Sequence, residues 1–127
     1  PPPASIGVKT AQRDRQVVAV CGDGSFQMSM NELAAVKAGG FDLKIVLFRN
    51  GVLGLVNQIQ GKEPYHGPFG VRLEGDPDFA AIASAYGVPS MTLRDEAKVE
   101  ETLDRFLAKE GPCLLIAEVS PEWKTTD

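Results

Sequence analysis

The sequence contains no long apolar run and only two cysteines, and each shortage excludes a class of protein. Apolar stretches such as 45–48 and 113–117 are much shorter than the roughly 18–20 residues that cross a bilayer, so we expect no membrane segment. Cys21 and Cys113 are too few for the disulfide framework of a small secreted domain. Both lie in apolar stretches, which predicts buried, reduced thiols in a cytoplasmic protein.

An excess of positive charge is also absent. The 13 basic and 17 acidic residues give a net charge of -4, and no cluster of Lys and Arg offers a surface for nucleic acid. Apolar residues make up 43% of the 127, which is enough for the core of one domain spanning residues 1–127. Because the sequence opens on Pro1 rather than on methionine, we expect it to be a piece of a longer multidomain chain.

Short apolar runs alternate with amphipathic stretches, and this order is typical of a parallel sheet covered by helices. We predict an α/β fold with three layers, in which a doubly wound, mainly parallel sheet lies between helices. The expected strands are 17–21, 43–48, 90–93 and 113–119, and the expected helices are 29–38, a short one after 54, 76–86 and 95–110. The first strand is apolar throughout, which predicts a central strand buried on both faces.

Turn and capping residues separate these elements. Ser29 and Glu32 have the spacing of a capping box, and Asp76 precedes Pro77 as an N-cap precedes the first helical residue. Asp95 is the expected cap of the last helix. The Gly- and Pro-rich stretch 61–75 is predicted to be an exposed loop.

Polar residues follow the first two predicted strands, at the sheet edge where doubly wound proteins bind ligands. After the first strand, Gly22 and Gly24 would let backbone N–H groups approach an anion such as a phosphate. Asp23 lies between them, and a carboxylate beside a phosphate needs a cation between the two. This loop therefore predicts a phosphate site that contains Mg²⁺.

Asn50 follows the second predicted strand. One predicted helix and this second strand separate it from Asp23 in the sequence. Neighbouring strand ends lie about 4.8 Å apart, so the two side chains could share one ion. An amide oxygen is a neutral, hard ligand that suits Mg²⁺ or Ca²⁺. Taken alone, Asp23 could be a turn carboxylate and Asn50 a turn residue before Gly51, but the pair favours a cation site.

Two segments together resemble a known motif: Gly22-Asp23-Gly24-Ser25-Phe26, and Arg49-Asn50-Gly51-Val52-Leu53-Gly54 after the strand that starts at Lys44. They are similar to the diphosphate-binding motif of the thiamine diphosphate (ThDP) dependent enzymes, and above all to the acetolactate synthase and 2-oxo acid decarboxylase branch. The resemblance extends over nearly the whole chain, because 4–7 looks like the helix before the motif and 78–87 like a later helix.

The resemblance implies specific roles for the matching residues. The side chains of Asp23 and Asn50 and the main-chain carbonyl of Val52 would bind Mg²⁺. Leu55 would lie near the thiazolium and the substrate. The implied cofactor-binding residues are Gly22, Asp23, Gly24, Ser25, Asn50, Val52, Leu53, Gly54 and Leu55.

The chain departs from the family pattern at two positions. Arg49 stands where the family usually has Asn, although the adjacent ligand Asn50 is retained. Ile59 stands where acetolactate synthases commonly have a Trp that shapes the substrate pocket.

The implied function is to anchor the cofactor of an enzyme that decarboxylates a 2-oxo acid and ligates the product to a second carbonyl. In this family a second domain, usually from a partner subunit, holds the aminopyrimidine and supplies the activating glutamate. No segment here resembles that domain, so we expect no catalytic residue in this chain, no activity on its own, and a dimer or tetramer in the full enzyme. The missing domain could lie upstream in the same chain or on a separate subunit, as in sulfopyruvate decarboxylase-like enzymes.

Two other interpretations remain open. The chain could be a non-catalytic module that binds a diphosphate compound with Mg²⁺, or a flavodoxin-like or other Rossmann-type domain whose phosphate binding needs no metal. Outside the motif, His66 is expected to be an exposed loop residue, with a substrate contact as the alternative. Trp123 and the residues after it could pack against a neighbouring domain or form a frayed end.

Overall fold

The structure is a computed structural model that describes residues 1–62, 64 and 66–122. Its strands form one four-stranded sheet in the order β1-β2-β4-β3, and all neighbouring pairs are parallel. The elements are α1 (Pro2–Ala11), β1 (Val17–Gly22), α2 (Asp23–Gln27), the 3-10 turn η1 (Met30–Glu32), α3 (Leu33–Ala38), β2 (Leu43–Arg49), α4 (Gly54–Gln60), α5 (Phe79–Ala85), β3 (Ser90–Leu93), the 3-10 turn η2 (Glu96–Lys98), α6 (Val99–Ala108) and β4 (Cys113–Glu118). None of the helices in the described part of the chain has the length and apolar content of a membrane span.

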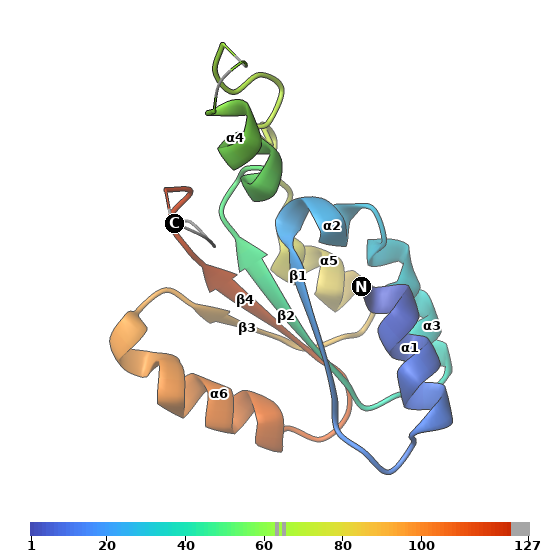
Figure 1. Cartoon of the computed structure of the whole chain (residues 1–127). Helices are drawn as coiled ribbons and strands as arrows, with labels where there is room; N and C mark the ends of the chain where they lie inside the picture. The colour runs from blue at the N-terminus through green and yellow to red at the C-terminus, as the bar shows by residue number, and fades with distance from the viewer. Residues whose placement is uncertain (63, 65, 123–127) are drawn as a thin grey trace.

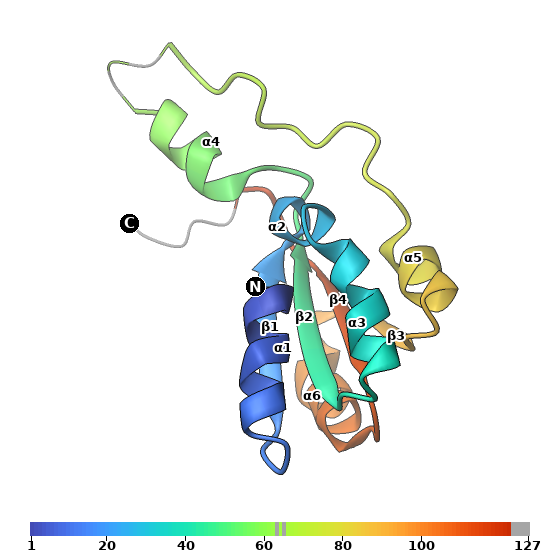
Figure 2. The same ribbon diagram turned by 90° about the vertical axis from the view of Figure 1, so that its right-hand side faces the viewer.

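The helices lie on both faces of the sheet (Figure 1). Helices α1, α3 and α5 lie on one face and α6 lies on the other, as the rotated view shows (Figure 2). Helix α4 and the segment after it extend beyond the carboxyl ends of the strands. The predicted α/β fold with three layers and a parallel sheet is confirmed.

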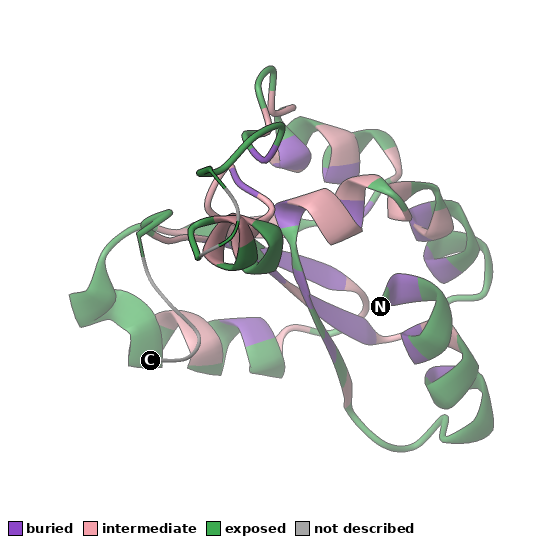
Figure 3. Cartoon of the chain, turned by 45° about the horizontal axis from the view of Figure 1, so that its top comes forward, coloured by how far each residue is buried: buried purple, intermediate pink, exposed green. Residues whose placement is uncertain are grey.

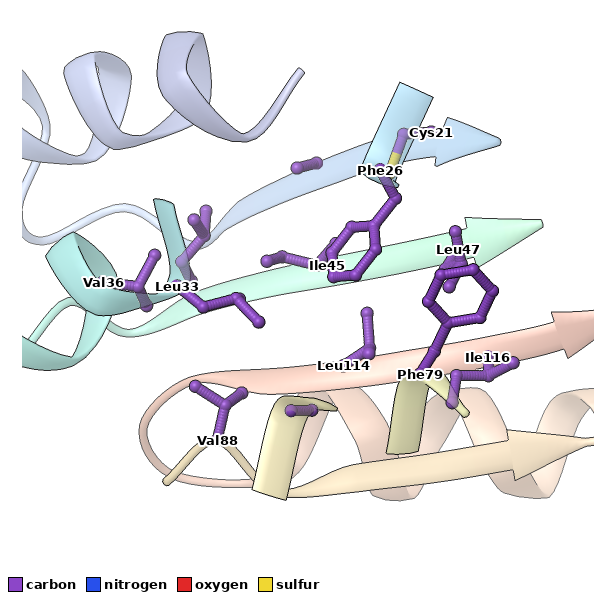
Figure 4. Packing of buried hydrophobic residues seen from close by; sticks show 13 residues of the cluster. Cys21, Phe26, Leu33, Val36, Ile45, Leu47, Phe79, Val88, Leu114 and Ile116 are labelled. Atoms are coloured by element: carbon purple, nitrogen blue, oxygen red, sulfur yellow. The ribbon is translucent and has the colours of Figure 1, made fainter. Parts of the chain in front are cut away.

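The main core lies between the sheet and α1, α3 and α5. Phe26 of α2 and Phe79 of α5 pack edge to face in the part of the core nearer the carboxyl ends of the strands, with ring centroids 5.7 Å apart and an interplanar angle of 79° (Figure 4). Side chains of alternate residues on the strands complete this cluster because successive side chains of a strand point to opposite faces. Its buried members are Ala19, Cys21, Phe26, Leu33, Val36, Leu43, Ile45, Leu47, Phe79, Ala83, Val88, Leu114 and Ile116.

The prediction that the first strand is central and buried on both faces is wrong. β1 is at the edge of the sheet, and its side chains alternate between buried and accessible. Val18 and Val20 on its second face are 42% and 54% exposed. The second face is covered over β3 and β4, where Phe106 of α6 packs on Cys113 and Leu115. Figure 3 shows the resulting contrast between the buried inner strands and the more exposed edge.

The helix predicted over 29–38 is present as the 3-10 turn η1 and the helix α3 that follows it directly, and a further short helix precedes it. A short helix, α2, starts directly after β1 at Asp23, and the η1 turn separates it from α3. The predicted capping box is absent, because Ser29 makes no side-chain cap hydrogen bond and its hydroxyl instead donates to the carbonyl of Ser25 at 3.1 Å. Ser29 is nevertheless the N-cap residue of η1, so the helical segment begins where the sequence predicts, without the predicted capping box.

The predicted cap of α5 is also wrong by two residues. Asp78 is the N-cap and accepts a hydrogen bond from the Ala81 N–H at 3.0 Å. Asp76 instead forms an ion pair with Arg49 of β2. The predicted cap at Asp95 is confirmed, although it caps the η2 turn that leads into α6.

A lysine is completely buried at the amino end of β2. Lys44 is 0% exposed, and its ammonium forms an ion pair with Asp42. The same group donates to the carbonyls of Lys109 and Gly111, each at 2.6 Å. It therefore joins the start of β2 to the turn between α6 and β4.

Candidate functional site

The Asp23 carboxylate lies at the junction of β1 and α2 and is 2% exposed. One of its oxygens, Oδ1, accepts the N–H of Gly24 at 2.9 Å. The other, Oδ2, accepts the N–H groups of Asn50 at 2.9 Å and Gly51 at 2.7 Å. The side chain predicted to bind a cation is thus fixed between the first and second strand ends.

The sheet register brings Asp23 and Asn50 together. Gly22, the last residue of β1, is level with Phe48 in the parallel β1–β2 pair, so β2 ends only one residue further along, at Arg49, and Asn50 follows directly. Past β2 the backbone turns sharply, with Gly51 at a φ of +68°, which favours glycine. The Asn50 amide oxygen accepts the Val52 N–H at 3.1 Å and stabilises this turn.

The candidate ligand carbonyl belongs to Val52, which is 8% exposed. Its loop is held by a second segment: the Leu53 N–H donates to the Val71 carbonyl at 2.8 Å, and the Leu73 N–H donates to the Gly51 carbonyl at 2.9 Å. These two bonds form an isolated antiparallel bridge between Val52 and Arg72. Among the described residues, no hydrogen bond reaches the Val52 carbonyl itself, so this oxygen is available to another donor or to a cation.

The donor set at this edge is made of oxygens. It combines the carboxylate of Asp23, the amide of Asn50 and the main-chain carbonyl of Val52, which are the hard ligands that Mg²⁺ prefers. Within residues 1–62, 64 and 66–122, no group of three or more His, Cys, Asp or Glu side chains is placed to hold a metal. A cation here would therefore depend on amide and main-chain oxygens in addition to Asp23, which is the chemistry expected from the sequence.

Gly24 allows the α2 turn and the loop after β2 to approach closely. A Cβ atom at this position would lie 2.5 Å from a methyl carbon of Leu53 and 3.7 Å from a methyl carbon of Leu73. The absence of a side chain is thus needed for packing between the two candidate loops. The sequence suggested only that the glycine helps an anion to approach.

We expect Gly24→Ala to displace the Leu53 side chain and to weaken cofactor binding, while the fold persists. The cost of such overpacking is about 1–3 kcal/mol, because the clash is with the end of a side chain that can move. Gly7→Ala is the matched control, since a Cβ there meets nothing within 4 Å. It lies inside α1 and should stabilise that helix slightly. If calorimetry shows that Gly24→Ala and Gly7→Ala bind ThDP equally well, the close approach of position 24 to Leu53 does not matter for cofactor binding.

The remaining predicted cofactor residues surround these loops. Ser25 is half-buried in α2, and Gly54 begins α4 beside the Asn50 side chain, whose nitrogen would lie 3.4 Å from a Cβ at position 54. Leu55 and Ile59 lie on α4 and are 68% and 46% exposed. Leu55, which is predicted to lie near the substrate, and Ile59, which stands in place of the family's Trp, are therefore both largely accessible in this chain.

A cleft of about 790 Å³ opens beside the Val52 loop. Of the three candidate ligands, Val52 lines it, together with Gln27 of α2 and Asn57 of α4. The rest of its wall is made by 68–74, Asp76, Pro121 and Glu122. The cleft thus adjoins the candidate cation site, while Asp23 and Asn50 lie outside its wall.

Sequence reasoning missed an ion-pair network at this edge of the sheet. Arg49 Nε donates to Asp76 Oδ2 at 2.6 Å, and Arg49 Nη1 lies 3.4 Å from Glu118 Oε1. Arg94 also donates to Glu118, at 2.9 and 3.0 Å, and these hydrogen bonds lower the pKa of Glu118. The hydrogen bond to Asp76 raises the pKa of Arg49 further. The departure from the family pattern at position 49 was the signal that could have revealed this network.

The predicted burial of the two cysteines and the predicted exposure of His66 are confirmed. Cys21 and Cys113 are free and buried, and burial raises the pKa of the Cys21 thiol to about 11. His66 is exposed in the loop after α4. Trp123 and the residues that follow it lie outside the described part of the chain.

Comparison with known proteins identifies related sequences. The family model described as "Thiamine pyrophosphate enzyme, C-terminal TPP binding domain" matches residues 1–117. The chain is 39% identical over 127 residues to the acetolactate synthase isozyme 2 large subunit of Escherichia coli K12, covering 95% of this chain and 23% of that protein. It is 34% identical over 122 residues to the isozyme 1 large subunit of the same organism, covering 96% and 22%. An acetolactate synthase of Arthrospira platensis is 36% identical over 119 residues, covering 93% and 21%. The chain therefore spans about a fifth of the length of these relatives.

Proposed function

Because the chain belongs to the thiamine pyrophosphate enzymes, as their C-terminal TPP-binding domain, we propose that it holds the diphosphate of this cofactor, ThDP, through Mg²⁺. The observation that carries the proposal is the hydrogen bonding of one buried carboxylate, Asp23, to the backbone of the loop that contains Asn50 and Val52. This contact unites the two halves of the sequence motif into one site.

The chain's own residues would divide the task. The side chains of Asp23 and Asn50 and the carbonyl of Val52 would bind the cation, since all three are hard oxygen donors. Gly22 and Gly24 have no side chains and would let phosphate oxygens approach the loop, although the Gly24 N–H already donates to Asp23 Oδ1. The bound cofactor would supply carbanion stabilisation, and the protein would supply binding and orientation.

We further propose that the domain is the cofactor-anchoring part of an enzyme that decarboxylates a 2-oxo acid and ligates the product, as an acetolactate synthase does. The names of the relatives support this branch. The glutamate that activates the aminopyrimidine would come from a pyrimidine-binding domain, either upstream in a longer chain or on a separate subunit of a split decarboxylase. The chain alone would then bind the cofactor without turnover, and the complete enzyme would be a dimer or tetramer.

Calorimetric titration of the chain with ThDP, with and without Mg²⁺, tests the proposal. We expect binding heat that requires Mg²⁺, because Asp23 would otherwise bring a buried negative charge close to the diphosphate. Binding of equal strength in the presence of a chelator would favour a metal-independent phosphate-binding domain. Binding that needs Mg²⁺ but gives no activity with any pyrimidine-binding partner would favour a non-catalytic module.

A further inference from the structure

The residue before Asn50 is an arginine with two acidic partners. Arg49 Nε lies 2.6 Å from Asp76 Oδ2, and Nη1 lies 3.4 Å from Glu118 Oε1. The guanidinium carbon lies 5.9 Å from the centre of the Phe79 ring. The side chain therefore lies over the first residue of α5, and its partners are residues of this chain.

Asp76 connects this arginine to the other candidate loop. Its second oxygen, Oδ1, accepts a hydrogen bond at 3.3 Å from Gln27, the last residue of α2. Helix α2 begins at Asp23 and β2 ends at Arg49, directly before Asn50, so Asp76 joins the two elements that adjoin the candidate ligands. The Asp76 side chain is only 12% exposed, whereas the nearby cap residue Asp78 is exposed.

Asp76 also ends the segment that supports the Val52 loop. This segment bonds to the loop through the Leu53 N–H and through the Leu73 N–H. Asp76 follows three positions after Leu73, so its ion pair fixes the end of the segment to the end of β2. The loop 50–53 is thus held on one side by Asp23 and on the other by a segment that Arg49 secures.

We infer that Arg49 is a positioning residue for the cofactor site. Through Asp76 it holds the segment 71–76 against the loop 50–53 and so keeps the Asn50 amide and the Val52 carbonyl in place for the cation. This inference rests on the proposed function, because it concerns the geometry of the proposed ligands. Arg49 itself contacts neither cation nor phosphate.

The test compares four variants of Arg49 and Asp76 in the whole chain. Arg49→Gln and Asp76→Asn each remove the ion pair, and we expect each to weaken Mg²⁺-dependent ThDP binding by roughly tenfold, equivalent to about 1.4 kcal/mol. The double variant should be no weaker than either single one, because both remove the same contact. Arg49→Lys should recover part of the affinity, since an ammonium can still pair with Asp76 but cannot bind both acids in the same fork geometry.

Arg94→Gln is the matched control. It removes an arginine from the same acidic partner, Glu118, but leaves the contact between Arg49 and Asp76 intact. We expect it to bind ThDP as the unchanged chain does. If Arg94→Gln loses as much affinity as Arg49→Gln, the inference is overturned. The loss would then follow from removing one positive charge near Glu118 and not from breaking the contact between Arg49 and Asp76.

Hydrogen exchange on the ligand-free chain provides a readout that does not depend on the cofactor. We expect the Leu53 and Leu73 amides to exchange roughly tenfold faster in Arg49→Gln and Asp76→Asn, with the core amides of β2 unchanged. If the unchanged chain fails to bind ThDP, the proposed function fails, and the exchange rates still decide whether Arg49 secures the segment. If ThDP binds but both amides exchange at the original rate in both variants, the positioning role is wrong.

Discussion

Asp23→Asn is expected to reduce Mg²⁺-dependent ThDP binding by at least about a hundredfold, which corresponds to about 2.7 kcal/mol. The substitution removes the one anionic ligand of the proposed cation site and keeps the size of the side chain. Calorimetry at a fixed, saturating Mg²⁺ concentration measures the change.

The same variant is expected to lose stability in the absence of any ligand. The carboxylate accepts N–H groups at both oxygens, from Gly24 at one and from Asn50 and Gly51 at the other. An asparagine has only one amide oxygen. Whichever way its amide is turned, the NH₂ group faces either the Gly24 N–H or the N–H groups of Asn50 and Gly51, so at least one buried N–H loses its acceptor. The expected cost is about 1–3 kcal/mol for each unsatisfied group.

Asp78→Asn is the control for this substitution. Asp78 makes an equivalent acid-to-backbone contact at the start of α5, where it is exposed, and asparagine is also a good N-cap. Stability and ThDP binding should both be close to those of the unchanged chain. Retention of Mg²⁺-dependent binding by Asp23→Asn would show that the metal assignment is wrong.

Lys44→Met is expected to give the largest loss of stability outside the site, about 2–4 kcal/mol by urea denaturation. Methionine fills a similar volume but leaves the carbonyls of Lys109 and Gly111 without the donor that reaches them at 2.6 Å. Removing the buried charge offsets part of this loss, and Asp42 is 47% exposed and can be solvated by water. The net effect is therefore smaller than for a fully buried ion pair.

Lys98→Met is the corresponding surface control. Lys98 is exposed in the η2 turn, so its replacement should change the free energy of unfolding by less than about 0.5 kcal/mol. Similar denaturation midpoints for the two variants would mean that Lys44 is not a structural cross-link. Loss of ThDP affinity in a Lys44→Met chain that remains folded would likewise be unexpected, since Lys44 lies near the amino end of β2 whereas Asn50 follows its carboxyl end.

The proximity of Asp23 and Asn50 could be predicted because it depends only on two neighbouring parallel strands that end at the same edge. The structure confirms this proximity, whereas the binding of Mg²⁺ stays a prediction. The position of β1 in the sheet could not be predicted, because its residues are apolar on both faces and period-2 alternation is therefore invisible. Exposure of Val18 and Val20 follows from where α6 lies, which is a tertiary property.

The capping errors have a similar origin. Asp76 and Asp78 flank Pro77, and local rules permit either one to cap the next helix. The choice depends on Arg49, which is distant in sequence and takes Asp76 as its partner. Helix α2 was missed because its five residues are too few for a helical period to be recognised and the loop glycines obscure its start.

The register that pairs Gly22 with Phe48 has a consequence for the evolution and engineering of this domain. Residues inserted at the turn after α3 would lengthen a connection and leave the pairing of Gly22 with Phe48 intact. One residue deleted within β2 would shift its end by about 3.3 Å and turn the following side chains to the opposite face. The connections between strands can therefore vary in length, whereas the number of residues between the paired part of β2 and Asn50 must stay the same.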